Sequence, residues 1–74
     1  MDVGVWTIGS RSLVLATNMN DGAAGIDLVG IVPDVRRSTW REAFNSGGLL
    51  SEDGWLSLKK HGSIALIFRW GYLF

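Results

Sequence analysis

The apolar residues of this chain fall in short runs in which apolar and polar positions alternate, or in runs rich in β-branched and aromatic side chains. Both patterns are typical of β-strands, because successive side chains of a strand point to opposite faces of its sheet. Ten glycines and one proline are spread between the runs and mark turns. No convincing helix is seen. The pattern predicts six strands, at residues 3–8, 13–17, 23–29, 36–44, 55–59 and 63–70.

Turn residues connect the predicted strands. The short spacing between the first two strands, at residues 9–12, predicts a hairpin. Residues 18–22 combine Asn, Asp and Gly, which tolerate positive φ and close tight turns. Pro33 is expected to end the pairing before the fourth strand, because proline cannot donate a ladder hydrogen bond. Residues 45–48 and 52–54 are the remaining predicted turns.

The last predicted strand is apolar on both sides. Ile64, Leu66 and Phe68 share one face, which we expect to point inward, and Ile67 lies between them on the other face. A strand whose apolar positions do not alternate with polar ones is typical of a strand covered on both faces. We therefore expect both faces of this strand to be covered.

Residues 36–44 allow two interpretations. As a strand, they place Trp40 and Phe44 on one side, which predicts that both belong to the core, with basic and small residues on the other side. As a helix, they begin at Ser38 or Thr39 and carry Glu42 three residues after Thr39, the pattern of a capping box. A helix this short is marginal without strong packing, so the strand is favoured.

Six short strands about ten residues apart predict an all-β fold, a small antiparallel β-sandwich or partly open barrel of about six strands. A chain of 74 residues is expected to form one domain, at residues 1–74, with an apolar C-terminal tail at residues 70–74. The hydrophobic fraction of 47% and the mean hydropathy of +0.22 exclude a disordered chain. Such a domain needs strong packing or a partner surface, because no cysteine is present to form a disulfide.

Charge narrows the possible partners. Seven basic and seven acidic side chains give a net charge of zero, so we expect no nucleic-acid partner. No membrane partner is expected either, since the longest clean apolar run, residues 64–68, is closed by Arg69 and is far too short to span a bilayer.

Residues that carry chemistry are few. His61 is the only histidine and is flanked by Lys60 and Gly62, so we interpret it as a turn residue that bonds a local carbonyl. The carboxylates are scattered and form no obvious acid pair. We expect no catalytic residue, no metal site and no cofactor.

The four tryptophans are the more informative set. Flat indole rings stack on the apolar faces of sugars, so an exposed tryptophan is a candidate carbohydrate-binding residue. Trp55 is expected to point outward, since its neighbours Leu56 and Leu58 define the inward face with the opposite phase. Trp70 opens the tail, which is too apolar to be left in water. Trp55 and Trp70 are therefore candidate sugar platforms, and contact with another surface explains the tail better than a ligand does.

The order of these elements resembles a known family. The segments that carry the resemblance are residues 12–20, Ile26-Asp27-Leu28, residues 39–44 and residues 56–68. Together they look like the C-terminal β-sandwich of the α-amylase superfamily of glycoside hydrolases, and the sandwich that closes α-galactosidases is similar. The resemblance implies an accessory domain without catalytic groups, which packs against a (β/α)8 barrel and in some members touches polysaccharide.

We therefore expect a non-catalytic accessory domain of a glycoside hydrolase, in contact with its catalytic domain or with a second copy of itself. One alternative is a free-standing carbohydrate-binding module that uses Trp55 and Trp70 to hold polysaccharide. Another is an oligomerising structural protein whose tail, residues 70–74, forms the interface.

Overall fold

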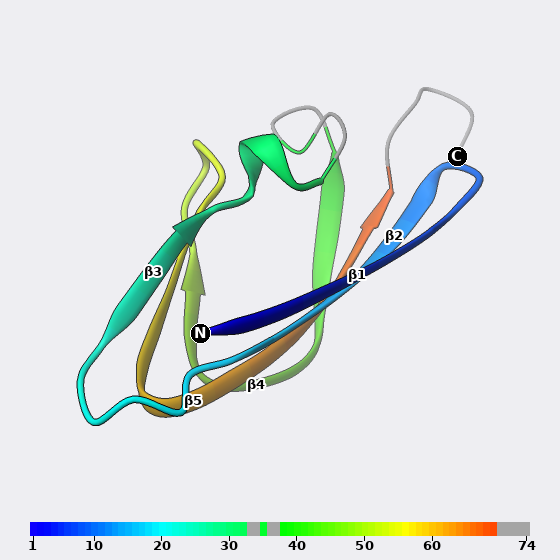
Figure 1. Cartoon of the computed structure of the whole chain (residues 1–74). Helices are drawn as coiled ribbons and strands as arrows, with labels where there is room; N and C mark the ends of the chain where they lie inside the picture. The colour runs from blue at the N-terminus through cyan, green and yellow to red at the C-terminus, as the bar shows by residue number, and fades with distance from the viewer. Residues whose placement is uncertain (33–34, 36–37, 70–74) are drawn as a thin grey trace.

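The computed structural model describes residues 1–32, 35 and 38–69. The elements bounded within these residues are five strands and a 3₁₀ turn: β1 (Asp2–Ile8), β2 (Arg11–Thr17), β3 (Ala24–Asp27), η1 (Leu28–Gly30), β4 (Thr39–Leu50) and β5 (Trp55–Arg69). The strands form one open, curled antiparallel sheet, a half-barrel (Figure 1). The predicted all-β fold class is confirmed. The predicted turn at Pro33, Trp70 and the tail at residues 70–74 lie outside the described residues.

The longest strand, β5, organises the sheet. Along its second half it pairs with β2, which in turn pairs with β1, so the predicted hairpin of the first two strands is confirmed. Along its first half it pairs with β3. On its other side it pairs with β4 before and after residues 59–62. The free edges of the sheet are therefore β1 and β3 on one flank and the twelve-residue β4 on the other.

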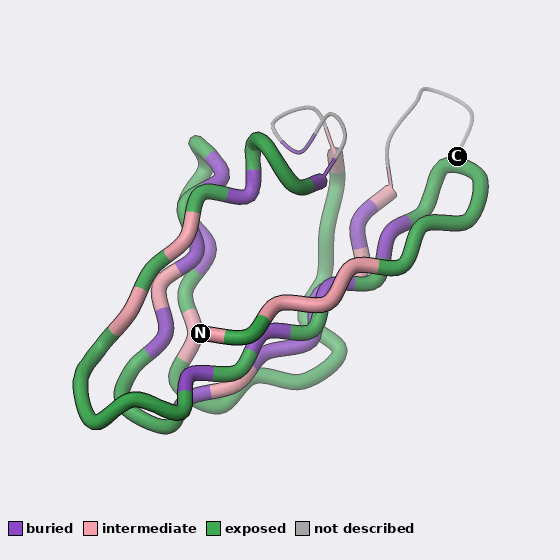
Figure 2. Tube along the Cα trace, in the orientation of Figure 1, coloured by how far each residue is buried: buried purple, intermediate pink, exposed green. Residues whose placement is uncertain are grey.

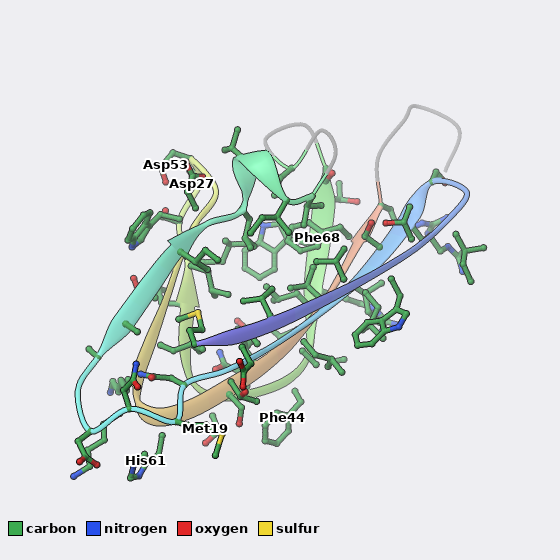
Figure 3. All side chains as sticks on the ribbon, in the orientation of Figure 1. Met19, Asp27, Phe44, Asp53, His61 and Phe68 are labelled. Carbon is green, nitrogen blue, oxygen red and sulfur yellow. The ribbon has the colours of Figure 1, made fainter. Side chains whose placement is uncertain are left out.

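The core lies inside the curl of the sheet (Figure 2). Ile64, Leu66 and Phe68 of β5 all point inward and are fully or almost fully buried, as the alternation of this strand predicts. Figure 3 shows Phe68 within the curl. The inward residues of the other elements complete the core: Val14, Ala16, Leu28, Val32, Val35, Leu50, Leu56 and Leu58.

The structure corrects the division of the last third of the chain. Two strands, residues 55–59 and 63–70, are predicted, but β5 runs unbroken from Trp55 to Arg69. Between the pairs Ser46–Ser63 and Gly48–Leu58, β4 has one unpaired residue and β5 has four. These four residues, 59–62, form a bulge in β5. The lysines and glycine that suggest a turn instead form this wide bulge inside one strand.

Asn18 holds the bulge in place. This side chain is 2% exposed and follows directly after β2. Its Nδ2 donates to the carbonyl oxygens of Gly22 at 2.9 Å and Lys59 at 3.1 Å, and lies 3.4 Å from that of Leu58. Its backbone N–H donates to Gly62 at 2.8 Å. One amide thus satisfies carbonyl groups that the bulge removes from the ladder.

The predicted phase of the fourth strand is right as far as Glu42 and wrong beyond it. β4 is a strand and not a helix, but it continues through the predicted turn at residues 45–48 to Leu50. Its register shifts between Glu42 and Phe44, so that Ala43 is the extra residue of a bulge. A one-residue shift reverses the faces of all residues beyond it. Trp40 and Phe44 therefore lie on opposite faces and are 40% and 57% exposed, and neither is a core residue.

The third strand is shorter than predicted. β3 ends at Asp27, whose Oδ1 accepts a hydrogen bond from the N–H of Val29 at 3.0 Å and caps the 3₁₀ turn η1. The N–H of Leu28 donates to Gly54 at 2.8 Å and ties η1 to the turn between β4 and β5, which falls within the predicted residues 52–54. Leu28 is buried although it lies beyond the strand.

Candidate functional site

The outer face of the sheet, opposite the core, carries an apolar surface that the described part of the chain leaves uncovered. The strand registers arrange its residues in cross-strand rows that run over β1, β2, β5 and β4. The tryptophan row is Trp6, Leu13, Ile67 and Arg41, and the glycine row beside it is Gly4, Leu15, Ala65 and Phe44.

Five side chains of these two rows form what we call the outer patch: Trp6, Leu13, Leu15, Phe44 and Ile67. Trp6 is 55% exposed, Leu13 37%, Leu15 41% and Phe44 57%, and Ile67 is half-buried. At about 200 Å² for a fully exposed large side chain, these fractions correspond to about 400 Å² of apolar surface. A contiguous apolar patch of this size on a small protein is often functional.

The outer patch exists because the two central strands are apolar on both faces. In β2, Val14 and Ala16 point into the core, and Leu13 and Leu15 point outward. The sequence predicts that both faces of β5 are covered. On its outer face this prediction is only partly correct, since Ala65 is 9% exposed but Ile67 is only half-buried. Strands of this composition are typical of a sheet with a layer on each side.

Phe44 joins the patch through the bulge in β4. It lies opposite Ala65 on the outer face because Ala43 is the extra residue of the register shift. Figure 3 shows Phe44 outside the curl, in contrast to Phe68. Sequence periodicity missed this residue, because a bulge at an alanine has no local signal comparable to a glycine or a proline.

A shallow hollow of about 120 Å³ lies beside the patch. Its lining comes mainly from outer-face side chains of β4 and β5: Thr39, Trp40, Arg41, Ile67 and Arg69.

The row beyond the tryptophan row, which we call the arginine row, is Ile8, Arg11, Arg69 and Thr39. At the other end of the same face lies the aspartate row, Asp2, Thr17, Ser63 and Ser46. The outer face thus carries two arginines at one end and one carboxylate, that of Asp2, at the other.

Trp55 points outward as predicted and is 46% exposed. Its ring covers Gly25 on the neighbouring strand β3: a Cβ at Gly25 would lie 2.6 Å from Cζ2 of the indole. Trp6 covers Gly4 in the same way, with Cη2 at 2.7 Å from the position of a Cβ. Glycine allows each indole to lie flat on the backbone, which leaves one ring face toward water. Trp70, the second predicted sugar platform, lies outside the described residues.

His61 contacts a different group from the one that the sequence predicts. Its φ of 56° is positive, and its Nε2 lies 3.4 Å from Oδ1 of Asp21, a carboxylate and not the carbonyl that was expected. Both side chains are exposed, at 59% and 94%. An ion pair in such exposure contributes little to stability. His61 lies within the bulge, near Met19 (Figure 3).

The described residues contain no group of three or more His, Cys, Asp or Glu side chains placed to hold a metal ion. Within the same residues, no helix is long and apolar enough to cross a membrane. Comparison with family models, with curated proteins and with solved structures finds no match to this chain.

Proposed function

We propose that this chain is a non-catalytic β-domain that acts by packing its outer patch against a protein surface. The observation that supports the proposal is the outer patch itself, about 400 Å² of apolar surface on the two central strands and their neighbours. Its aromatic residues, Trp6 and Phe44, are of the type enriched in protein interfaces, and Arg41 beside them is another such type.

The resemblance to the C-terminal sandwich of the α-amylase superfamily adds the class of parent protein. On that basis we propose an accessory domain of a glycoside hydrolase, whose partner surface is either the catalytic barrel or a second copy of the domain. An accessory role fits the outer patch, since a sheet face of this kind is covered when it lies against another protein layer.

A photocrosslinking experiment tests this function. Benzoylphenylalanine replaces Leu15, at the centre of the patch, and irradiation of the producing cells is expected to link position 15 to a protein. The product is expected to contain either a glycoside hydrolase or a second copy of this chain. The same crosslinker at Leu49 is the control, because Leu49 is 70% exposed and lies outside both rows. Absence of any protein product at position 15, or equal products at both positions, contradicts the proposal.

Carbohydrate binding by Trp55 is a second candidate function. The observation that favours it is the flat indole on Gly25, with nearly half of its surface exposed. Ser57 lies on the same face, and Asp27 is the direct cross-strand neighbour of Trp55. A flat aromatic ring beside hydroxyl and carboxylate groups is a chemically suitable platform for a sugar ring.

Calorimetric titration with a maltooligosaccharide tests this second candidate. It predicts saturable heat at millimolar sugar and an affinity at least about tenfold weaker in Trp55→Ala, a loss of about 1.4 kcal/mol. Trp6→Ala is the matched control, since Trp6 also lies flat on a glycine but on β1, and it should bind like the wild type. No heat from the wild-type protein, or equal losses in both variants, rejects Trp55 as a sugar platform.

A further inference from the structure

The outer face carries both a projecting group and a hollow that can receive it. Phe44 of the glycine row projects from β4 and is 57% exposed. The hollow of about 120 Å³ lies one row away, between Arg41 and Ile67. An enclosed apolar cavity of about 150 Å³ accommodates benzene, so this open hollow, at about 120 Å³, can receive part of a phenyl ring. The guanidinium of Arg41 at its wall is a favourable neighbour for an aromatic face.

The two central rows are complementary in side-chain size on β5, where Ile67 of the tryptophan row stands beside Ala65 of the glycine row. When a second outer face is laid on the first so that each tryptophan row covers a glycine row, Ile67 meets the small Ala65 of the other copy, Leu13 meets Leu15 and Arg41 meets Phe44. Sheets that pack face to face interdigitate in this manner.

A two-fold axis across the strands produces this arrangement. It places each strand over the same strand of the other copy, running in the opposite direction. Each Phe44 therefore lies over the hollow at Arg41 of the other copy. It also places each arginine row over an aspartate row, which brings Arg11 near Asp2 of the second copy. An axis along the strands instead places Arg11 over Arg69 of the second copy, and these like charges repel.

The area agrees with a dimer. An interface is about 60% apolar, so about 400 Å² of apolar surface per copy corresponds to about 1,300 Å² of total buried surface. This value lies within the range of specific protein interfaces, about 1,200–2,000 Å², and above that of ordinary crystal contacts, below about 800 Å². The free edge of β4 is a poorer contact, because its two register shifts interrupt the ladder that a second strand would need.

We infer that two copies of this chain pack outer face to outer face about a two-fold axis across the strands, each placing Phe44 in the hollow between Arg41 and Ile67 of the other. This inference rests on the proposed function, in which the outer patch meets a protein surface, and it names a second copy as that surface. In a glycoside hydrolase, such a contact would join two enzymes.

Sedimentation velocity across a wide concentration range tests the dimer. The wild-type protein is expected to dimerise, and Leu15→Lys is expected to weaken the dimer at least thirtyfold, since it places a charge in the centre of the contact. Leu49→Lys is the matched control and should dimerise like the wild type. Circular dichroism establishes that both variants are folded, because both leucines point into solvent in the single chain.

A charge exchange tests the direction of the axis. Within one chain, Asp2 and Arg11 lie at opposite ends of the β1–β2 hairpin, about 20 Å apart, and cannot pair. Arg11→Asp and Asp2→Arg are each expected to weaken the dimer severalfold, and the double variant is expected to restore it. Restoration requires contact between two copies, since a single chain cannot supply it.

Several results would overturn this inference. A wild-type monomer at all concentrations does so, and so does a dimer that Leu15→Lys leaves intact. A monomer that Leu15→Lys destabilises means that the same chain covers the patch. A dimer in which the double charge variant is no better than the single variants rejects the proposed axis. If the protein is monomeric but position 15 crosslinks to a hydrolase, only the dimer fails and the proposed function stands.

Discussion

Replacement of Phe68 by alanine is expected to unfold most of the protein at room temperature. Phe68 is fully buried on the inner face of β5, between Ser12 of β2 and Trp40 of β4 in the register. Removal of a buried phenylalanine ring lowers the free energy of unfolding by about 3–5 kcal/mol. A domain of this size without a disulfide has a total stability of about the same magnitude. Urea denaturation followed by circular dichroism measures the loss.

Two variants separate the effect of burial from that of residue type. Phe68→Leu retains most of the volume and is expected to lower the free energy of unfolding by less than about 1.5 kcal/mol. Phe44→Ala removes the same ring from the outer face and is expected to change it by less than about 0.5 kcal/mol at concentrations below those of self-association. A Phe68→Ala protein that stays folded with a loss below 1 kcal/mol, on the order of the Phe44→Ala effect, contradicts the position of the core.

The inner side of the sheet is the part that the sequence predicts well. The alternation in β5 places Ile64, Leu66 and Phe68 inward, and all are buried. The spacing of the first two apolar runs predicts their hairpin, and the register confirms it. Both predictions succeed because an alternating pattern and a short connection can be recognised from residues that are neighbours in the sequence. A period of two residues determines which side chains share a face as long as no residue is inserted.

The two bulges limit what the sequence can predict. At Ala43 a single extra residue moves Phe44 to the outer face, and an alanine gives no sequence signal of a bulge. At residues 59–62 the polar sequence suggests a turn, but the flanking segments remain in one strand because β4 pairs with both. A bulge depends on the partner strand and is therefore decided by the tertiary structure.

The outer patch is predicted by the sequence only in part. The apolar character of Leu13 and Leu15 is evident in the sequence, but β2 is apolar on both faces, so periodicity does not distinguish the inner side from the outer. The outward direction of Trp55 is predicted, since Leu56 and Leu58 fix its phase. Its support by Gly25 depends on the pairing of β3 with β5, which the sequence does not specify. The residues of the candidate site are thus visible in the sequence, but their assembly is not.

Asn18 is expected to be the most important polar residue for stability. The Asn18→Ala variant loses the donor for the carbonyl groups of Gly22 and Lys59, and the acceptor for the N–H of Asn20 at 3.1 Å. Since Asn18 is 2% exposed, water cannot replace these bonds without opening the bulge. An unsatisfied buried group costs about 1–3 kcal/mol, so we expect a decrease of about 3 kcal/mol in the free energy of unfolding.

Asn45 provides a matched comparison in the same sheet. Its amide also makes three hydrogen bonds, to Glu42 at 2.8 Å and to the carbonyl and N–H of Gly48 at 3.0 and 2.7 Å, but it is exposed. Water can replace these bonds, so Asn45→Ala is expected to lower the free energy of unfolding by less than about 1 kcal/mol. Hydrogen exchange should also show faster exchange at the N–H of Asn20 in Asn18→Ala. Equal losses in the two alanine variants would mean that the amide does not hold the bulge, because burial is the main difference between the two sites.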